Sequence, residues 1–288
     1  MQKRTLVYIA LLFLAPIFFG ARAEAKTYEY YKTIANQEDY NKLYNFAKNI
    51  TPDTFKYIEM TGIGDIDADL YDYVLLDHPE IWAASACYAN FSRPYDYNLM
   101  KEDDKHFMFK IKDIVNDLGN MKECNDFGKV KKIHDYIGKL LTYYATHDSD
   151  ETRSLGRALA TNKGCCVAYA KLFKLLCNWY QVESICLYSM THCYNYVRLD
   201  GKWYGVDCTW DDGANTYNYF LFGEFTRKLH EDHKSVYKVP DLEYEYWEKV
   251  VKIKGTKYLL NHNGKAKRLK GKSKNKRIRY GGITFKVK

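Results

Sequence analysis

The chain has 288 residues, 47% of them hydrophobic, which is enough for a sizeable core in either one large domain or a domain with an appendage. The net charge of +8 is unevenly spread: Lys249–Lys288 supplies +15 with no acidic residue and residues 1–23 supply +3, which leaves −10 between them. Six of the eight cysteines lie between Cys165 and Cys208, a clustering that argues against a fold held mainly by disulfides.

The first 23 residues are predicted to be a cleavable signal peptide. Lys3 and Arg4 precede an almost unbroken apolar run, and Ala21-Arg22-Ala23 offers small residues at the spacing that signal peptidase needs. The apolar run is shorter than the roughly 20 residues of a membrane-spanning helix. The rest of the chain is therefore expected outside the cytoplasm, either secreted or periplasmic.

Residues 24–125 are predicted to form a mostly helical region. Glu38–Ile50 places its apolar residues on one helical face, and Asp69–Leu76 is expected to be a second helix that ends before Pro79. Phe107–Ile114 is the exception and is expected to be a strand, although Lys and Asp at alternate positions weaken that pattern.

Residues 126–240 are predicted to form the main α+β unit. Helical spacing is expected from Val130 to Tyr144, and a short helix capped by Ser154 follows. The helix Cys166–Tyr180 begins just after Gly164. Three strand-like segments come next, and they are Ser184–Met190, His192–Leu199 and Lys202–Thr209. This order predicts a helix packed on an antiparallel sheet.

Residues 241–288 are predicted to be a small basic β-rich segment. Val250–Ile253, Lys257–Leu260 and Ile283–Val287 have the pattern of short strands separated by Asn-Gly and Gly-Gly turns. The change in charge suggests that the part after Trp247 is separable, and that it attaches to an anionic wall, membrane or glycan. No nucleic acid is expected as a partner, because an exported protein seldom meets it.

The turn Asp200-Gly201 fixes the geometry of the hairpin that contains it. A two-residue turn pairs Leu199 with Lys202, and the same register carried outward places His192 and Asp207 on one face as diagonal neighbours. Diagonal neighbours lie about 7–8 Å apart at Cα, within reach of an imidazole and a carboxylate. The same register makes Cys193 and Cys208 directly opposed, as a disulfide or as two packed thiols.

Cys166 is the candidate nucleophile. It lies where a helix is expected to begin, so unpaired backbone N–H groups and the helix dipole favour the thiolate. The same N–H groups are suited to stabilising an oxyanion, and a nearby His192 would activate the thiol and protonate a leaving amine. Asp207 would then hold the imidazole in the required tautomer.

Three segments resemble motifs of the transglutaminase-like superfamily. Gly164–Ala170 is similar to Gly-Val-Cys-x-Gly-Tyr-Ala, with Cys165 in place of Val and Ala168 in place of Gly. His192–Val197 is similar to His-Ala-Trp-Asn-x-Val, and Asp200–Asp212 follows Asp-Gly-x-Trp-Tyr-x-Val-Asp-x-Thr-Trp-Asp-Asp nearly throughout. The resemblance spans roughly Tyr71 to Tyr237.

The resemblance implies a papain-like core with Cys166, rather than Cys165, as nucleophile, His192 as general acid and base, and Asp207 as the residue that orients it. No cofactor is implied. The expected activity is cysteine-dependent acyl transfer on amide bonds of proteins or peptides through a thioester, with hydrolysis favoured. Two alternatives stay open: a transglutaminase that crosslinks proteins at glutamine, and a non-catalytic module that binds a wall or a protein.

Two other features are expected to be structural. Asp65, Asp67 and Asp69 alternate like a calcium loop, but Leu70 and Leu76 occupy the positions where such a loop has Gly and Glu, so no metal is expected. His134 is expected to be a packed or surface histidine.

Overall fold

The computed structural model describes residues 27–52, 54, 67–84, 97–145, 150–214, 216–243, 245–247, 249–261, 265–271 and 275–287. The predicted signal peptide and Asp65 lie outside these residues. Helices and two larger sheets are both present, in agreement with the predicted α+β class. Among the described helices, none combines the length and the apolar character needed to cross a membrane.

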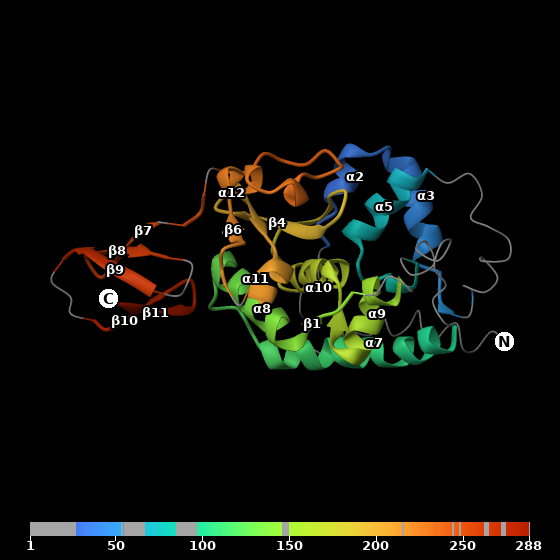
Figure 1. The fold of residues 1–288 in the computed structure, drawn as a ribbon, viewed down its shortest axis with the longest axis horizontal. Helices are drawn as coiled ribbons and strands as arrows, with labels where there is room; N and C mark the ends of the chain where they lie inside the picture. Colours follow the sequence, from blue (N-terminus) through green and yellow to red (C-terminus); the bar gives the residue numbers. More distant parts are fainter. Residues whose placement is uncertain are drawn as a thin grey trace.

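Helices and short turns precede the central sheet in the chain (Figure 1). They are α2 (Tyr30–Ile34), α3 (Gln37–Ala47), α5 (Ala68–Asp77), α7 (Tyr97–Leu118), α8 (Asp126–Leu140), η1 (Asp150–Arg153) and α9 (Leu155–Thr161). Polar side chains cap several of them: Asn36 caps α3, Asn125 caps α8 and Ser154 caps α9. Asp67, one of the three alternating aspartates, is the cap of α5.

The strand predicted at Phe107–Ile114 is wrong, because this segment lies inside α7. Phe107, Ile111, Ile114 and Val115 are buried, which is the i, i+4, i+7, i+8 spacing of one helical face. The exposed face carries lysines and aspartates together with Met108 and Phe109, so an incidental alternation over a few residues had imitated a strand.

The central sheet is antiparallel, with strand order β3-β4-β5-β6. Its strands are β3 (Ser184–Tyr188), β4 (Cys193–Leu199), β5 (Lys202–Val206) and β6 (Phe220–Phe222). Helix α10 (Cys166–Trp179) packs against β3 and β4, and α8 packs on α10 (Figure 1). The remaining short elements are β1 (Thr142–Tyr143), β2 (Lys163–Gly164), α11 (Cys208–Ala214), α12 (Glu224–Lys228) and η2 (Glu231–His233).

The hairpin of β4 and β5 has the predicted register, from Leu199↔Lys202 to Asn195↔Val206. Asp200 and Gly201 both have positive φ values, 51° and 82°, as the tight turn requires. The prediction fails beyond Val206, because the strand ends and α11 begins at Cys208.

Cys193 and Cys208 are therefore not opposed. Cys193 pairs with Tyr188 in the neighbouring strand, and its sulfur lies 3.8 Å from the sulfur of Cys186. Cys186 and Cys193 are diagonal neighbours, whose Cα atoms typically lie about 7–8 Å apart, beyond the usual disulfide range of about 4.4–6.8 Å. The seven cysteines within the described residues are all free thiols.

The C-terminal strands form a separate sheet with order β10-β11-β9-β8-β7. The strands are β7 (Val250–Ile253), β8 (Thr256–Leu260), β9 (Lys265–Lys270), β10 (Arg277–Tyr280) and β11 (Ile283–Val287). Three of them fall on the predicted segments, whereas β9 and β10 were not predicted because they consist mainly of Lys and Arg. This sheet occupies the end of the molecule opposite α3 and α5 (Figure 1).

Phe127, at the start of α8, joins the C-terminal sheet to the rest of the molecule. Its ring lies 5.7 Å from Tyr280 and 6.3 Å from Phe285 in the sheet, and 5.6 Å from Tyr246 in the connecting segment. Trp247 adds a hydrogen bond from its indole nitrogen to the Phe220 carbonyl oxygen. The basic segment is thus packed on α8, which bears on how separable it is.

Candidate active site

Cys166 is the first residue of α10, and a close packing contact determines how the chain enters this helix. A Cβ atom on Gly164 would lie 2.7 Å from the Cβ of Ala168 and 3.1 Å from that of Ala158, so only glycine fits without displacement. Cys165 is the N-cap residue, and its N–H donates to the Thr152 carbonyl oxygen over 2.8 Å. Cys166 is half-buried, whereas the rest of the helix is mostly buried.

His192 lies in the tight turn that joins β3 to β4. Its N–H donates to Ser189 Oγ over 3.0 Å, and its carbonyl oxygen accepts from the Ser189 N–H over 2.9 Å. These two bonds fix the backbone of His192 immediately before β4. The His192 side chain is 8% exposed, and the Trp210 ring lies 5.4 Å from the imidazole.

His192 and Asp207 are in direct contact, as predicted, although both lie just outside the paired residues of the hairpin. Nε2 of His192 lies 2.6 Å from Oδ2 of Asp207, a length typical of a charge-assisted hydrogen bond. The other ring nitrogen, Nδ1, has no hydrogen-bond partner within the described residues. It is therefore the nitrogen left for proton exchange.

Asp207 is buried and accepts four hydrogen bonds. Its Oδ1 accepts from the backbone N–H groups of Thr209 and Trp210, each over 3.0 Å, and so caps α11. Its Oδ2 accepts from His192 over 2.6 Å and from His233 over 3.0 Å. Burial alone raises the pKa of Asp207, but the hydrogen bonds from the two histidines outweigh it and lower the pKa to about 2. Asp207 is therefore ionised throughout the physiological range.

His233 is the residue that sequence reasoning missed. It lies in η2, and Tyr194 Oη donates to its carbonyl oxygen. Its ring packs between Trp210, 4.6 Å away, and Phe222, 4.7 Å away. Nδ1 of His233 is buried and has no hydrogen-bond partner among the residues that the structure describes, and burial lowers the pKa of His233. It is thus a neutral imidazole that donates through Nε2 to Asp207.

The sequence held only a weak signal for His233. His230 and His233 are three residues apart and follow the site-bearing strands, but two histidines at this spacing are common on any short helix. The contact joins residues 26 positions apart in the chain, and local periodicity does not specify the path between them.

His192, Asp207 and His233 also form the type of cluster that can hold a metal ion, since their ligand atoms lie within 4.8 Å of one another. Both imidazole nitrogens, however, lie at hydrogen-bond distances from the same carboxylate oxygen. A metal would have to displace both hydrogen bonds in a buried space. Hydrogen bonding accounts for the arrangement without one.

The ionisation of each of the adjacent thiols, Cys165 and Cys166, depends on the other thiol. A hydrogen bond from the Cys166 thiol lowers the pKa of Cys165 to about 6, helped by the N–H groups of Val167 and Ala168 at the start of α10. The same bond, together with burial, raises the pKa of Cys166. The backbone N–H of Cys193, next to His192, acts in the opposite sense on Cys166 and places this thiol beside the start of β4. Within the described residues no hydrogen bond joins the Cys166 thiol to His192.

A second buried histidine–aspartate pair lies close to the first. His134 Nε2 is 3.0 Å from Asp211 Oδ2, and Asp211 Oδ1 accepts from the Tyr219 N–H over 2.9 Å. No thiol within the described residues is bonded to His134. This pair links α8 to α11. His134 is therefore a packed histidine, as expected from the sequence.

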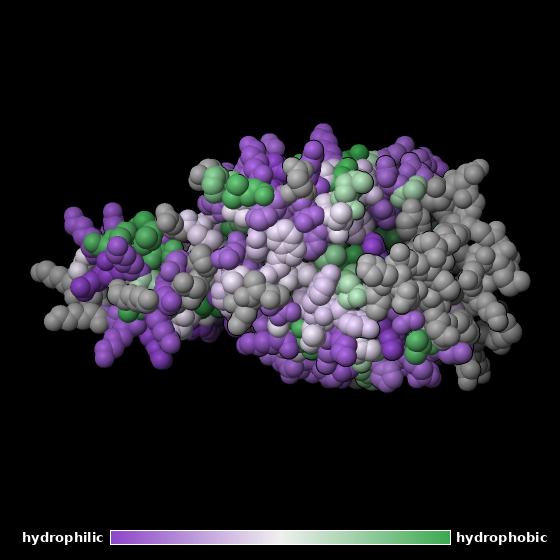
Figure 2. Space-filling model, in the orientation of Figure 1, coloured by the Kyte–Doolittle hydropathy of each residue, from purple (hydrophilic) through white to green (hydrophobic). Residues whose placement is uncertain are grey.

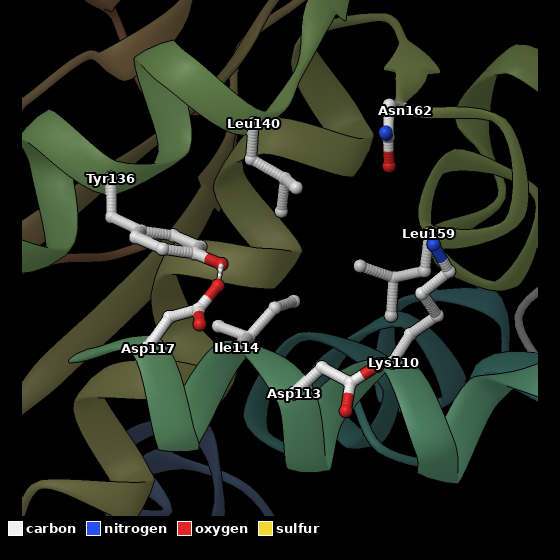
Figure 3. Close-up of a pocket in the computed structure, with 8 residues that line it drawn as sticks. All are labelled: Lys110, Asp113, Ile114, Asp117, Tyr136, Leu140, Leu159 and Asn162. Atoms are coloured by element: carbon white, nitrogen blue, oxygen red, sulfur yellow. Dashed lines mark hydrogen bonds between the residues drawn. The ribbon is translucent and has the colours of Figure 1, made fainter. Parts of the chain in front are cut away.

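The hollow shown in Figure 3 lies away from these residues. Its volume is about 130 Å³, and it lies between α7, α8 and α9. Its lining residues are Lys110, Asp113, Ile114, Asp117, Tyr136, Leu140, Leu159 and Asn162. A hydrogen bond of 2.8 Å from Tyr136 Oη to Asp117 crosses one end. None of the candidate catalytic residues borders it.

Comparison with known proteins adds no family assignment. No protein-family model matches the chain, and no curated protein matches it significantly.

Proposed function

We propose that this protein is an exported cysteine-dependent enzyme that cleaves amide bonds of proteins or peptides through a thioester. Cys166 is the nucleophile, His192 the general acid and base, and Asp207 the residue that orients His192. The fold that goes with this proposal is a papain-like core of the transglutaminase-like kind, with α10 packed on the sheet β3–β6.

The observation that carries the proposal is the 2.6 Å contact between His192 Nε2 and Asp207 Oδ2. Because Nε2 donates to a permanently ionised carboxylate, the imidazole is held in the tautomer that leaves Nδ1 free to take and give a proton. A buried carboxylate with four hydrogen bonds also stabilises the imidazolium form.

The position of Cys166 supports its role. Its sulfur lies beside the backbone N–H of Cys193, one residue from His192, and at the start of a buried helix. Cys165 competes for the negative charge, but it is 7% exposed, whereas Cys166 is the more accessible of the two.

In the proposed reaction His192 Nδ1 takes the proton of the Cys166 thiol, and the resulting thiolate attacks the amide carbonyl carbon. The C–N bond then breaks as His192 Nδ1 gives that proton to the departing amine. The acyl group remains on sulfur as a thioester. His192 Nδ1 then takes a proton from water, whose oxygen attacks the thioester and releases the carboxylic acid and the thiolate. If a primary amine replaces water, the same steps crosslink proteins.

One observation favours a second candidate, a non-catalytic module. The raised pKa of Cys166, caused by its hydrogen bond to Cys165 and by burial, disfavours a resting thiolate at that sulfur. A binding module would have no need for a reactive thiol.

Alkylation separates the two candidates. Iodoacetamide at neutral pH should label Cys166 first in the reduced, folded protein, and Cys166→Ala should abolish this rapid labelling. Cys165→Ser should accelerate it, because removal of the neighbouring thiolate lowers the pKa of Cys166. Preferential labelling of Cys165 would make that residue the nucleophile, and slow uniform labelling would leave the binding module as the better account.

Mass spectrometry then identifies the reaction. The protein is incubated with a glutamine-containing peptide and a primary amine, with Cys166→Ala as the control. Chain cleavage identifies a peptidase, loss of ammonia with hydration identifies a deamidase, and loss of ammonia with amine addition identifies a transglutaminase.

A further inference from the structure

The C-terminal sheet has one apolar face and one charged face. Residues paired across neighbouring strands point to the same side of a sheet, so the register assigns each side chain to a face. One face holds the buried residues Val251, Tyr258, Leu260, Ala266, Ile278 and Phe285. The opposite face, here named the cationic face, carries Lys252, Lys257, Lys265, Lys267, Lys270, Arg277, Arg279 and Lys286.

The cations of this face form two rows. Lys252, Lys257 and Lys270 are directly paired across β7, β8 and β9. Arg277, Lys286 and Lys265 are directly paired across β10, β11 and β9. Neighbours within a row are about 4.8 Å apart, the spacing of adjacent strands.

Strand β9 connects the two rows. Lys265 belongs to one row, Lys270 to the other, and Lys267 lies between them opposite Leu259. The register shift between Lys257 and Tyr258 brings Lys270 to the same face as Lys267. The result is a continuous track of positive charge that crosses all five strands.

Little of this charge is compensated by the part of the chain that the structure describes. Like charges directly opposite each other destabilise a sheet, and here they are opposed in both rows. No Asp or Glu occurs from Lys249 to Lys288. Within the described ranges, the one ion pair formed by the cationic face joins Arg279 to Glu123 over 3.7 Å. An anionic partner would remove a repulsion that the fold itself leaves in place.

The uncharged residues of the face narrow the chemistry of that partner. Among the paired strand residues that the structure describes, they are Val250, Leu259 and Thr284, so this part of the face offers no aromatic ring on which a nucleobase or a sugar could stack. It also lacks the Trp and Phe side chains that anchor interfacial segments in a bilayer. Lysine dominates, and its ammonium group binds phosphate as a point charge without the planar geometry of arginine.

We propose that the cationic face binds a linear phosphodiester polymer with an aliphatic backbone, such as a polyol phosphate chain. The polymer lies along the track, with its phosphates at the lysine and arginine side chains and its carbon chain over Val250 and Leu259. Hydrophilic side chains cover much of this end of the molecule (Figure 2), which lies apart from α10 (Figure 1). The inference does not depend on the activity proposed for Cys166.

Binding of the full-length chain to fluorescent poly(glycerol phosphate) over a series of salt concentrations tests the proposal. The slope of log affinity against log salt should be about −0.7 for each phosphate that is neutralised. The variant Lys252→Gln/Lys257→Gln/Lys270→Gln should flatten the slope by about 2 and weaken binding about 10- to 100-fold at moderate salt.

The control Lys105→Gln/Lys112→Gln/Lys139→Gln removes the same charge from α7 and α8 and should change affinity less than about twofold. An equal loss in both variants would overturn the proposal in favour of diffuse attraction. Binding to phosphatidylglycerol vesicles without binding to the polymer would overturn it in favour of a membrane surface. Salt-sensitive self-association without polymer binding would also overturn it. The partner of the cationic face would then be the acidic part of a second copy, residues 24–248.

Discussion

Charge is used in opposite ways at the two ends of this molecule. Around Asp207 a single carboxylate, 1% exposed, is held by four hydrogen bonds from two histidines and two backbone N–H groups. On the cationic face, charged side chains are mostly exposed and oppose one another across the strands. Buried charge fixes the position of its partners, whereas exposed charge specifies little beyond the sign of what it attracts. Substitutions around Asp207 should therefore have large effects on activity and stability, whereas substitutions on the cationic face should have small effects that add up gradually.

The largest effect is expected for Asp207→Asn. The amide would present a donor to His192 or lose its contacts with the N–H groups of α11, so the imidazole would lose its fixed tautomer. Turnover of the substrate identified by mass spectrometry should fall about 10³–10⁴-fold, with a stability loss of about 3–5 kcal/mol from the unpaired buried groups.

Asp211→Asn is the matched control for that substitution. It breaks a buried histidine–aspartate pair of similar geometry, with His134 at 3.0 Å, and should lower stability comparably. Rapid alkylation of Cys166 should persist in this variant. Equal loss of alkylation in both variants would mean that Asp207 acts through folding alone.

The next largest effect is expected for Phe127→Ala, which tests how independent the two regions are. Phe127 is 3% exposed and touches both the C-terminal sheet and its connecting segment, so truncation should cost about 3–5 kcal/mol. Urea unfolding should show the loss, and limited proteolysis should cut the C-terminal sheet earlier.

Phe109→Ala is the control, because Phe109 is 69% exposed on α7 and should tolerate the change. A chain that ends near Trp247 should keep a reactive Cys166 but expose Phe127 to solvent. If Phe127→Ala left proteolysis unchanged, the sheet would be held to α8 by other contacts.

A smaller, pH-dependent effect is expected for His233→Asn. Burial lowers the pKa of His233 in the folded protein, so below pH 6.5 the unfolded chain takes up a proton that the folded protein resists. His233 therefore contributes stability above that pH and loses it as the pH falls, by about 1 kcal/mol per unit.

The His233→Asn variant should lack the part of the stability loss at low pH that His233 causes. Thermal unfolding between pH 5 and pH 8 measures this difference. His106→Gln, on the exposed face of α7, should leave the profile as it is in the unmodified protein. An unchanged profile in His233→Asn would show that the Asp207 contact keeps His233 titrating normally.

The smallest effect is expected for Lys257→Gln. Lys257 is directly opposed by Lys252 and Lys270, so its neutralisation should leave stability unchanged or raise it by up to about 0.5 kcal/mol at low salt. The gain should vanish at high salt, because exposed charges are then screened. A loss of stability would mean that the lysine stem packs on the sheet.

Sequence reasoning reached the His192–Asp207 contact because that contact is local. The register set by Asp200-Gly201 holds from Leu199↔Lys202 to Asn195↔Val206, and it brings the residues just beyond the two strands close together. The predicted strand pairing fails from Asp207 onward. Asp207 uses its side chain to cap α11, and the β-like composition of Cys208 and Thr209 gives no sign of this.

Two other errors have different physical causes. The helical spacing of Phe107, Ile111 and Ile114 was present in the sequence, but a window of eight residues was too short to separate it from alternation. Strands β9 and β10 carry mostly Lys and Arg, so their buried residues Ala266 and Ile278 were too few to reveal a pattern. Their pairing comes from the apolar residues of neighbouring strands.

The glycine in the first turn of α8 has a consequence for protein engineering. A Cβ atom at Gly128 would lie 1.5 Å from the carbonyl oxygen of Gly281 in the turn between β10 and β11, so the helix and the turn touch backbone to backbone. Alanine would favour the helix by about 0.5–1 kcal/mol on intrinsic propensity. The same alanine would force the turn away from α8. A sequence optimised for helix formation would thus lose the contact between α8 and the C-terminal sheet. Gly128 is unfavourable for the helix itself, but it permits this contact.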